Sequence, residues 1–368
     1  MSIPFVDLKA QHLPIRDELD VVIGEVIDKT AFVRGEYVEA FEREFATLVG
    51  IENCVSCGNG TDAIFIALKA LGVGPGDEVI TTAMSWIATS ETITLTGAKV
   101  VFVDVDEKTF TIDPRKIEEK ITKKTKAIIP VHLYGQPANM TDIMTMAKAH
   151  SLFVIEDCAQ AHLAKHNGRP VGTYGDFGTF SFYPGKNLGA FGDAGAIITN
   201  DKDLALRAKR FANHGSLVKH EHEIEGVNSR LDGIQAAILK VKMQYLRKWN
   251  KQRREVAEVY GTELKNIKEI KTPYIRGNNE HVFHLYVIQT ANRLKLRQFL
   301  ESHSIATGIH YPSPLPFLQA YEYLGHRPED FPVALELQST ILSLPMYPEF
   351  GSNSVKIVTS AIREFFQK

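Results

Sequence analysis

Lys186 lies in a stretch without an acidic neighbour. The segment SFYPGKNLGAFGDAG (181–195) surrounds this lysine with glycines, small residues and aromatics, and its first acidic residue is Asp193. A lysine amine becomes a useful nucleophile when burial or a nearby cation lowers its pKa, and its characteristic covalent product is a Schiff base. Gly185 and Gly189 would let the backbone approach a ligand closely. The spacing alone fits an exposed loop lysine equally well.

Two more segments place polar residues directly after apolar runs. The turn GNGTDA contains Gly60, Thr61 and Asp62 and leads into an amphipathic stretch, a position where free amides and the helix dipole favour an anion such as phosphate. Thr61 would add a hydroxyl there, or simply cap the helix. Asp157 and Gln160 follow the apolar run LFVIE. Asp157 either caps the next helix or pairs with a cationic ring nitrogen.

Together these groups match what pyridoxal phosphate requires of a protein. Its phosphate needs amide and hydroxyl donors, and Ser181 follows another apolar run where its hydroxyl would serve. Its ring nitrogen needs a carboxylate, and its aldehyde needs an amine. Trp86, in MSWIATSETI, would stack on the ring or lie in the core as one of only two tryptophans. The combination predicts a pyridoxal phosphate site anchored by Lys186.

Short β-branched runs alternate with amphipathic runs from about residue 50 to residue 200. This alternation predicts an α/β fold with a mostly parallel sheet, in which ligands bind at the carboxyl ends of the strands. The expected strands are Asn53–Cys57, Glu78–Thr82, Lys99–Asp104, Ala127–His132, Phe153–Glu156, Thr179–Phe182 and Gly195–Thr199. The expected helices between them are Asp62–Leu71, Ser85–Leu95, Pro114–Ile121 and Met140–His150.

The remaining sequence predicts helices and then a second, smaller unit. Residues 203–263 look largely helical apart from a polar loop at 219–228. After them, HVFHLYVIQT predicts a strand, RLKLRQFLESH predicts a helix, and YPSPLPF predicts a proline-rich loop. We therefore expect a large domain over residues 1–249, which includes the N-terminal segment, and a smaller α+β domain over 250–368.

Composition argues against several classes of protein. The formal charge is −2, from 42 Lys and Arg against 44 Asp and Glu, and no basic block predicts nucleic-acid binding. No apolar run reaches the roughly 18 residues of a membrane span, and the start MSIPFVDLKAQ does not resemble a signal peptide, so a cytoplasmic protein is expected. His281 and His284 would point to opposite sides of a strand, so no metal site is expected.

Cys54 and Cys57 form a C-x-x-C pair, which allows a redox protein or half of a zinc site. A second cysteine pair and a histidine pair at finger spacing are both missing from the sequence. Three cysteines are also too few for a disulfide framework. Ordinary buried thiols at the end of a strand are the favoured interpretation.

The sequence resembles the DegT/StrS-type nucleotide-sugar aminotransferases, a branch of the aspartate-aminotransferase-like fold of pyridoxal phosphate enzymes (fold type I). The likeness extends from IPFVDL and FVRGEYVEAFEREFA through GNGTDA, HLYGQPANM, EDCAQAH and SFYPGKNLGAFGDAGA to NSRLDGIQAAIL and GIHYPSPLP. By this resemblance Lys186 holds the cofactor, Asp157 pairs with its ring nitrogen and Gln160 lies beside the ring. The other implied cofactor contacts are Gly60, Thr61, Asp62, Trp86 and Ser181.

The resemblance also implies a second subunit and a substrate. Asn228, in NSRLD, matches an asparagine that reaches the phosphate of the neighbouring subunit, which implies a homodimer with shared active sites. Candidate substrate contacts are Tyr183, Lys219, Arg230, His310 and Tyr311. Lys219 and Arg230 also fit solvated charges, and His310 and Tyr311 also fit buried rings. Related dehydratases carry histidine in place of the lysine, so Lys186 favours amino transfer, with L-glutamate as donor and 2-oxoglutarate as its product.

The loop FYPGKNLGAFGDAG resembles relatives that aminate C3 of dTDP-linked 3-keto-6-deoxyhexoses. A C3 or C4 aminotransferase acting on a UDP-linked keto-sugar is the alternative. A pyridoxal phosphate-binding regulator without catalysis is a second alternative, although such a regulator would be expected to carry a DNA-binding extension. The pathway stays open among lipopolysaccharide O-antigen, S-layer glycan and antibiotic sugars.

Overall fold

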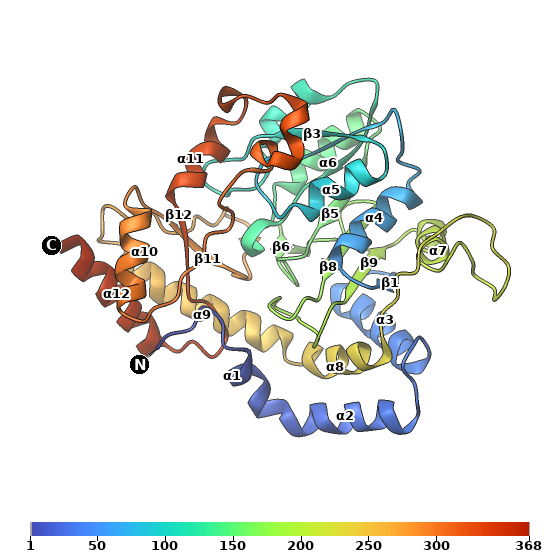
Figure 1. The fold of residues 1–368 in the computed structure, drawn as a ribbon, viewed down its shortest axis with the longest axis horizontal. Helices are drawn as coiled ribbons and strands as arrows, with labels where there is room; N and C mark the ends of the chain where they lie inside the picture. Colours follow the sequence, from blue (N-terminus) through green and yellow to red (C-terminus); the bar gives the residue numbers. More distant parts are fainter. Residues whose placement is uncertain (1, 368) are drawn as a thin grey trace.

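A seven-stranded sheet forms the centre of the molecule, which the computed structural model describes from residue 2 to residue 367 (Figure 1). The strand order is β1-β9-β8-β5-β4-β2-β3, and only β9 runs antiparallel to its neighbours in this sheet. The expected α/β fold with a mostly parallel sheet is confirmed. The strands are β1 (Asn53–Cys57), β2 (Glu78–Thr82), β3 (Lys99–Val103), β4 (Thr125–Ile129), β5 (Phe153–Asp157), β8 (Phe177–Ser181) and β9 (Gly195–Thr199).

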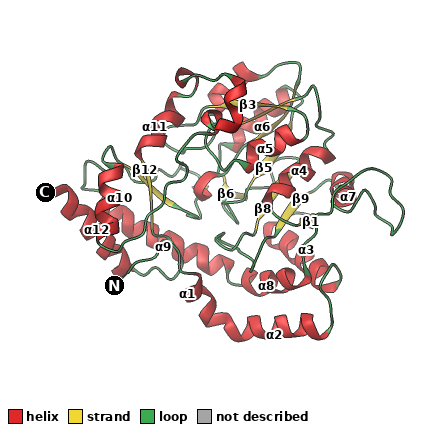
Figure 2. Ribbon diagram, viewed as in Figure 1, coloured by secondary structure: helices red, strands yellow, loops and turns green. Residues whose placement is uncertain are grey.

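Helices cover both faces of this sheet (Figure 2). On one face Ile64 of α4 and Ile93 of α5 belong to the same core as Ile197 of β9. On the other face Phe41 of α3 packs in a core that includes Ile198 of β9. Neighbouring strand residues point to opposite faces, so a strand buried on both sides must be apolar throughout. These helices are α3 (Glu36–Val49), α4 (Gly60–Ala70), α5 (Ala88–Leu95), α6 (Met140–Ala149), α7 (Lys202–Phe211) and α8 (Gly233–Met243).

Most predicted elements agree with the structure to within three residues, and two predictions are wrong. Pro114–Ile121 is not one helix but two 3₁₀ turns, Pro114–Lys116 and Glu118–Lys120, because its amides bond to carbonyls three residues back. In HVFHLYVIQT only Tyr286–Gln289 (β11) is a strand, so His281 and His284 precede the strand instead of facing opposite sides of it.

The C-terminal part has its own core. Strands β11 and β12 (Ile341–Leu344) pair antiparallel, and apolar side chains of α9 (Leu246–Leu264), α10 (Arg293–Ser302) and α12 (Ser352–Gln367) pack around them. A further small sheet joins β6 (Lys165–His166), β7 (Arg169–Pro170) and β10 (Asn279–Glu280). This separate core supports our proposal that the chain divides near residue 250.

Two segments cross that division. Ile3, near the N-terminus, packs in the C-terminal core and bridges to Ile305. Conversely Leu315, Tyr321 and α11 (Pro332–Thr340) pack with the core of the large sheet. The two parts are therefore joined by exchanged segments as well as by the long helix α9.

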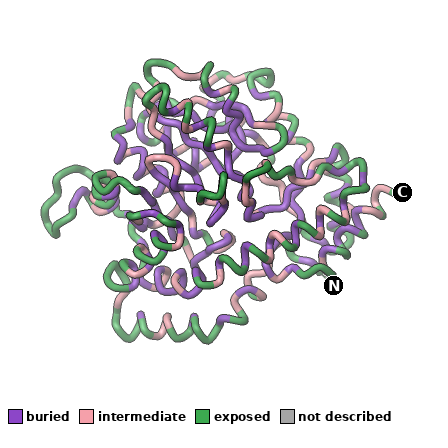
Figure 3. The backbone as a smooth tube through the Cα atoms, turned by 180° about the vertical axis from the view of Figure 1, so that it is seen from behind, coloured by how far each residue is buried: buried purple, intermediate pink, exposed green. Residues whose placement is uncertain are grey.

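The N-terminal helices and one long loop lie at the edge of the molecule. Helices α1 (Leu8–His12) and α2 (Arg16–Asp28) run along its lower side in Figure 1, and the tube in Figure 3 shows α2 largely exposed. The loop between α7 and α8, residues 212–232, projects outward beyond α7 and is here named the arm. Over residues 2–367, every helix is too short or too polar to cross a membrane.

Asp104 holds α11 against the large sheet. This buried carboxylate accepts hydrogen bonds from the Val333 and Ala334 amides at 3.1 and 2.9 Å, and from the Lys116 amine at 3.1 Å. Asp104→Ala is expected to lower the free energy of unfolding by about 2–4 kcal/mol, because the first turn of α11 loses its acceptors. Urea unfolding measures this loss. The exposed Glu119→Ala serves as control, and equal midpoints for the two variants would contradict the assigned role.

Candidate active site

A cavity of about 460 Å³ opens at the carboxyl ends of the parallel strands. It lies beyond β1, β2, β5 and β8, which bring together residues that are far apart in the sequence. Ligands of open α/β sheets bind at this edge. Nine of the predicted residues line the cavity: Gly60, Thr61, Trp86, Asp157, Gln160, Ser181, Tyr183, Lys186 and Tyr311.

The first turn of α4 and Ser181 form one end of the cavity. Asn59 caps the helix by accepting the Asp62 amide at 2.8 Å, so Thr61 is not the cap and its side chain stays available to the cavity. The Gly60 and Thr61 amides belong to the first helical turn, whose donors have no partner within the helix. A Cβ at Gly60 would lie 2.6 Å from the Ser181 Cβ, so only glycine permits this close approach. The result is a cluster of donors suited to an anion.

Asp157 ends β5 and is fixed by two hydrogen bonds. Its Oδ2 accepts from the Thr89 hydroxyl at 2.8 Å, and its Oδ1 accepts from the Ala159 amide at 3.1 Å. Since Thr89 donates to Asp157, the Ser85 hydroxyl 3.0 Å away must donate to Thr89. The carboxylate is only 5% exposed, yet it lines the cavity and keeps unused lone pairs there.

The Lys186 amine has no hydrogen bond or ion pair with any residue between 2 and 367. Its backbone amide donates to the Tyr183 carbonyl at 2.8 Å, which closes a tight turn at the cavity wall. Burial lowers the pKa of the amine from 10.5 to about 8, and the negative charge of Asp157 opposes part of this change. A substantial fraction of the neutral, nucleophilic form is therefore present near pH 8.

Amine labelling should report this lowered pKa. Below pH 8 the reactive, neutral fraction of Lys186 is expected to fall about tenfold per pH unit, and above pH 8 it should level off, because the neutral form then predominates. Reductive methylation of the cofactor-free chain, read by mass spectrometry over a pH series, measures this fraction. A small-molecule amine corrects for the reagent's own pH dependence. Levelling only near pH 10.5 would contradict the effect of burial.

Two aromatic residues, Trp86 and Tyr311, also line the cavity. Trp86 is 58% exposed, and its ring centroid lies 5.7 Å from that of Tyr311. Gln160 donates from Nε2 to the Tyr311 hydroxyl at 3.0 Å and accepts the Tyr134 amide at 2.7 Å. The Tyr134 hydroxyl in turn donates to the His310 carbonyl. This chain of contacts joins the large sheet to the segment 310–311 across the cavity.

His310 lies close to the cavity but does not line it. Its Nδ1 contacts the Ser343 hydroxyl at 2.8 Å, and its ring stacks on Phe5 with centroids 5.5 Å apart. Burial and the nearby Lys186 amine lower the pKa of His310 to about 4, so the imidazole is neutral at pH 7. Because this ring is neutral at pH 7, His310 places no positive charge beside the Lys186 amine.

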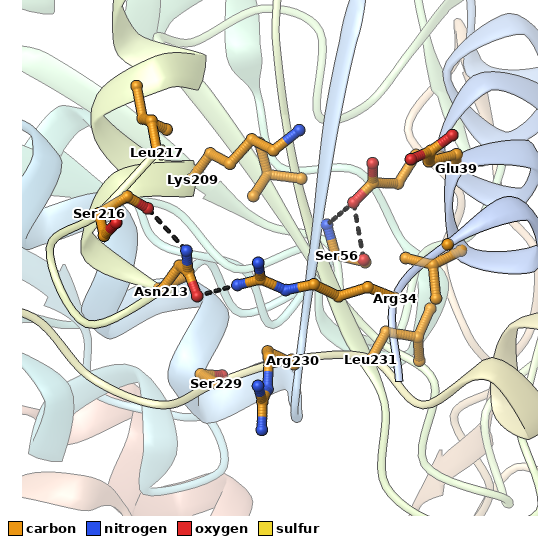
Figure 4. Close-up of a pocket in the computed structure, with 15 residues that line it drawn as sticks. Arg34, Glu39, Ser56, Lys209, Asn213, Ser216, Leu217, Ser229, Arg230 and Leu231 are labelled. Atoms are coloured by element: carbon orange, nitrogen blue, oxygen red, sulfur yellow. Dashed lines mark hydrogen bonds between the residues drawn. The ribbon is translucent and has the colours of Figure 1, made fainter. Parts of the chain in front are cut away.

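Besides His310, four predicted residues do not line the cavity of their own chain. The Asp62 carboxylate turns to the Ser229 hydroxyl, which donates to it at 2.6 Å. Lys219 and Asn228 are exposed on the arm. Arg230 lines a separate pocket with Arg34 and Lys209 (Figure 4). In that view Arg34 reaches across to Asn213.

The sequence analysis did not identify several residues that line the cavity or hold the predicted site residues in place. Asn59, Ser85, Thr89 and Asp193 line the cavity, and Tyr134 positions Gln160. Asn59 had a readable signal, because asparagine before a helix start is a preferred cap. The contact between Thr89 and Asp157 spans 68 residues and had no sequence signal.

Two clusters outside the cavity have structural explanations. His132, Glu156 and Cys158 lie close enough together to suggest a metal site. The Glu156 carboxylate, however, already accepts hydrogen bonds from His132 Nε2 and from the amides of Gly172, Tyr174 and Gly175, which explains its burial without a metal. Cys54 and Cys57 are free thiols, and burial raises the pKa of both well above the usual range, so the reactive thiolate is disfavoured.

The cavity fits pyridoxal phosphate by its donor set. The helix start and Ser181 offer the donors that a phosphate needs, and Asp157 offers a fixed carboxylate for a ring nitrogen. Lys186 offers a half-buried amine that has no partner in residues 2–367. Trp86 and Tyr311 add aromatic surface.

Comparison with solved structures agrees with this architecture. DesV of S. venezuelae superposes with a TM-score of 0.98 at 39% identity, covering 100% of this chain and 99% of that chain. Among curated proteins, the pleiotropic regulatory protein of Geobacillus stearothermophilus is 46% identical over 100% of this chain and 99% of its own length.

Two further relatives are named as sugar aminotransferases. The UDP-N-acetyl-3-dehydro-alpha-D-glucosamine 3-aminotransferase of Acidithiobacillus ferrooxidans is 43% identical and covers 98% of this chain and 97% of its own. The dTDP-3-amino-3,6-dideoxy-alpha-D-galactopyranose transaminase of Aneurinibacillus thermoaerophilus is also 43% identical, over 99% of each chain. Residues 15–363 match the DegT/DnrJ/EryC1/StrS aminotransferase family as a whole. The chain belongs to this family of pyridoxal phosphate-dependent aminotransferases.

Proposed function

We propose that the protein transfers an amino group from L-glutamate to C3 of a nucleotide-linked keto-sugar, most specifically a dTDP-linked 3-keto-6-deoxyhexose. One observation carries the proposal: Lys186, a half-buried residue, presents an amine without a partner in residues 2–367 to a cavity that also holds the fixed carboxylate of Asp157. The sugar and its carbon come from the likeness of the loop FYPGKNLGAFGDAG and from the names of relatives. Relatives with UDP-linked substrates make a UDP-sugar the alternative.

Each cavity residue has a role in this proposal. Bound pyridoxal phosphate supplies an electron sink for the carbon next to the transferred nitrogen. Lys186 would hold the cofactor covalently, and its free amine would act as the general base that removes a proton from the donor's Cα. Asp157 would keep a proton on the ring nitrogen. Ser181 with the Gly60 and Thr61 amides would bind the phosphate, and Trp86 would offer its ring as a stacking surface.

A second copy of the chain would complete the site. Exposed apolar side chains gather on the arm and on the turn before α3: Phe32, Val33, Leu217 and Val218. Hydrogen bonds from Arg34 to Asn213 and from Gly233 to Phe32 join these segments into one surface. Asn228 and Lys219 lie outside their own cavity, which supports a homodimer in which they reach the partner's site. We also expect this dimer to be cytoplasmic, in line with its three free cysteines.

Mixing two inactive chains tests the shared site. The variants Lys186→Ala and Asn228→Ala should each be inactive or strongly impaired. In a mixed dimer of the two variants, one active site combines the intact Lys186 of one chain with the intact Asn228 of the other. Co-expressed chains carrying different tags, purified as the mixed dimer, should therefore recover part of the activity. Each variant purified alone is the control. Recovery that never exceeds the sum of these controls would contradict a shared site.

A substrate panel tests the reaction. Purified protein with pyridoxal phosphate and L-glutamate is supplied with dTDP- and UDP-linked 3-keto and 4-keto sugars. Formation of 2-oxoglutarate and the mass of the amino-sugar report transfer, and ping-pong kinetics are expected. Transfer to 4-keto sugars alone would overturn the assignment to C3.

A regulatory role is the second candidate, because one relative is named a pleiotropic regulatory protein. It predicts cofactor absorbance that does not change when glutamate is added. An enzyme predicts a change of that spectrum with the amino donor, so the two proposals separate in one measurement.

A further inference from the structure

A second buried lysine lies behind the Lys186 loop. Lys242 of α8 is only 1% exposed and makes no ion pair with a carboxylate anywhere in residues 2–367. A buried ammonium without a counter-ion is costly, and burial lowers the pKa of Lys242 from 10.5 to about 7. Packing alone therefore does not explain why a lysine occupies this buried position.

The Lys242 amine has three contacts, and two of them are with residues 189–191. It donates to the Gly189 carbonyl and lies 5.4 Å from the centroid of the Phe191 ring. Its third contact is His12 of α1, with 3.0 Å between Nζ and Nε2. Burial and the Lys242 charge lower the pKa of His12 to about 4, so the neutral imidazole accepts this hydrogen bond at pH 7.

Residues 182–190 form a closed loop with Lys186 near its tip. The Ala190 amide donates to the Phe182 carbonyl at 2.7 Å and closes the base. Gly189 passes so near Pro184 that a Cβ would lie 2.4 Å from the Pro184 carbonyl oxygen. The Gly189 carbonyl that Lys242 holds is therefore part of the folded base of this loop.

Other contacts hold the same loop from the same side. Gln235 of α8 accepts the Phe191 amide at 2.8 Å, and Asn187 donates to Asn250 of α9 at 2.9 Å. Lys242 is the one member of this set that carries a charge when protonated, which its lowered pKa of about 7 places at pH 7 and below. A hydrogen bond from a charged donor contributes more than a neutral one.

We infer that Lys242 is a positioning residue for Lys186: its buried amine holds the Gly189 carbonyl and ties helix α1 to the base of the loop that presents Lys186. This inference rests on the proposed role of Lys186 in the reaction. The contact itself is a property of the chain without cofactor or substrate, so it can be tested separately.

Hydrogen–deuterium exchange of the cofactor-free chain is the test. Lys242→Met keeps the length and apolar stem but removes the donor, and it should speed exchange of the Lys186, Ala190 and Phe191 amides about ten- to hundredfold. Lys242→Arg keeps a charged donor and should restore much of the protection. Lys240→Met, on the same helix, removes only a surface ion pair with Glu44 and serves as control.

A second readout links the loop to the chemistry. In Lys242→Met the cofactor-free chain should take up pyridoxal phosphate covalently at least about tenfold more slowly, with the control unchanged. Unchanged loop exchange in Lys242→Met would overturn the inference, even if the melting temperature falls. Lys242→Leu, which also removes the donor, replaces it if the methionine variant does not fold, and the same exchange result decides. Failure of the sugar assay alone would leave these results intact and affect only the proposed function.

Discussion

Lys186→Ala is expected to lower the rate of amino transfer by about four orders of magnitude or more. The variant loses both the covalent attachment of the cofactor and the base that moves the donor's Cα proton. Among residues 2–367, no other lysine lines the cavity to replace it. Steady-state release of 2-oxoglutarate measures the loss, and the visible spectrum of the protein with pyridoxal phosphate should lose its lysine-linked band.

Lys186→Arg separates charge from proton transfer. The guanidinium keeps a cation near Asp157 but stays protonated throughout the working pH range, so it is neither nucleophile nor base. It should be as inactive as the alanine variant, while the exposed Lys265→Ala should keep full activity. Because Lys186 makes no hydrogen bond or ion pair within residues 2–367, both variants should retain the melting temperature of the wild type. An active arginine variant would mean that Lys186 contributes only charge.

The sequence predicted the sheet and the position of the cavity because both depend on local patterns. β1, β2 and β9 match their predicted bounds. β2 and β9 are short runs rich in β-branched residues, and glycine follows β1 directly at Gly58. Asp157 and Ser181 could be placed at one edge because the carboxyl ends of parallel strands meet there. Neither feature had to be located from contacts between particular residues distant in the sequence.

The supporting contacts could not be predicted, because they join residues distant in sequence. Gln160 bonds to Tyr311, which is 151 residues away, and Lys242 reaches a loop 53 residues earlier. Tyr134 can donate its amide to Gln160 from a backbone with φ of 60°, a left-handed conformation that no sequence signal predicted for a tyrosine. The prediction of a helix over Pro114–Ile121 was wrong because the tendency of a sequence to form a helix does not distinguish 3₁₀ turns from an α-helix.

Asp157→Asn is expected to lower kcat about 10²- to 10⁴-fold while the protein stays folded. The amide can still accept one hydrogen bond, from Thr89 or from the Ala159 amide, so the end of β5 keeps much of its geometry. It cannot hold a proton on the ring nitrogen, because it carries no negative charge. The electron sink is then weakened at each proton transfer, and the cofactor spectrum should change in the resting protein.

Two variants distinguish this loss of charge from a loss of structure. Thr89→Val leaves the carboxylate but removes one of its hydrogen bonds, and should lower kcat only about tenfold. Asp176→Asn changes a carboxylate at the other end of β5, where it accepts the Val154 amide at 2.8 Å, and should leave kcat unchanged. If Asp157→Asn retains more than about a tenth of the wild-type kcat, Asp157 is not the partner of the ring nitrogen. Equal losses in Asp157→Asn and Asp176→Asn would instead trace the effect to the strand, because both carboxylates help to fix β5 but only Asp157 lines the cavity.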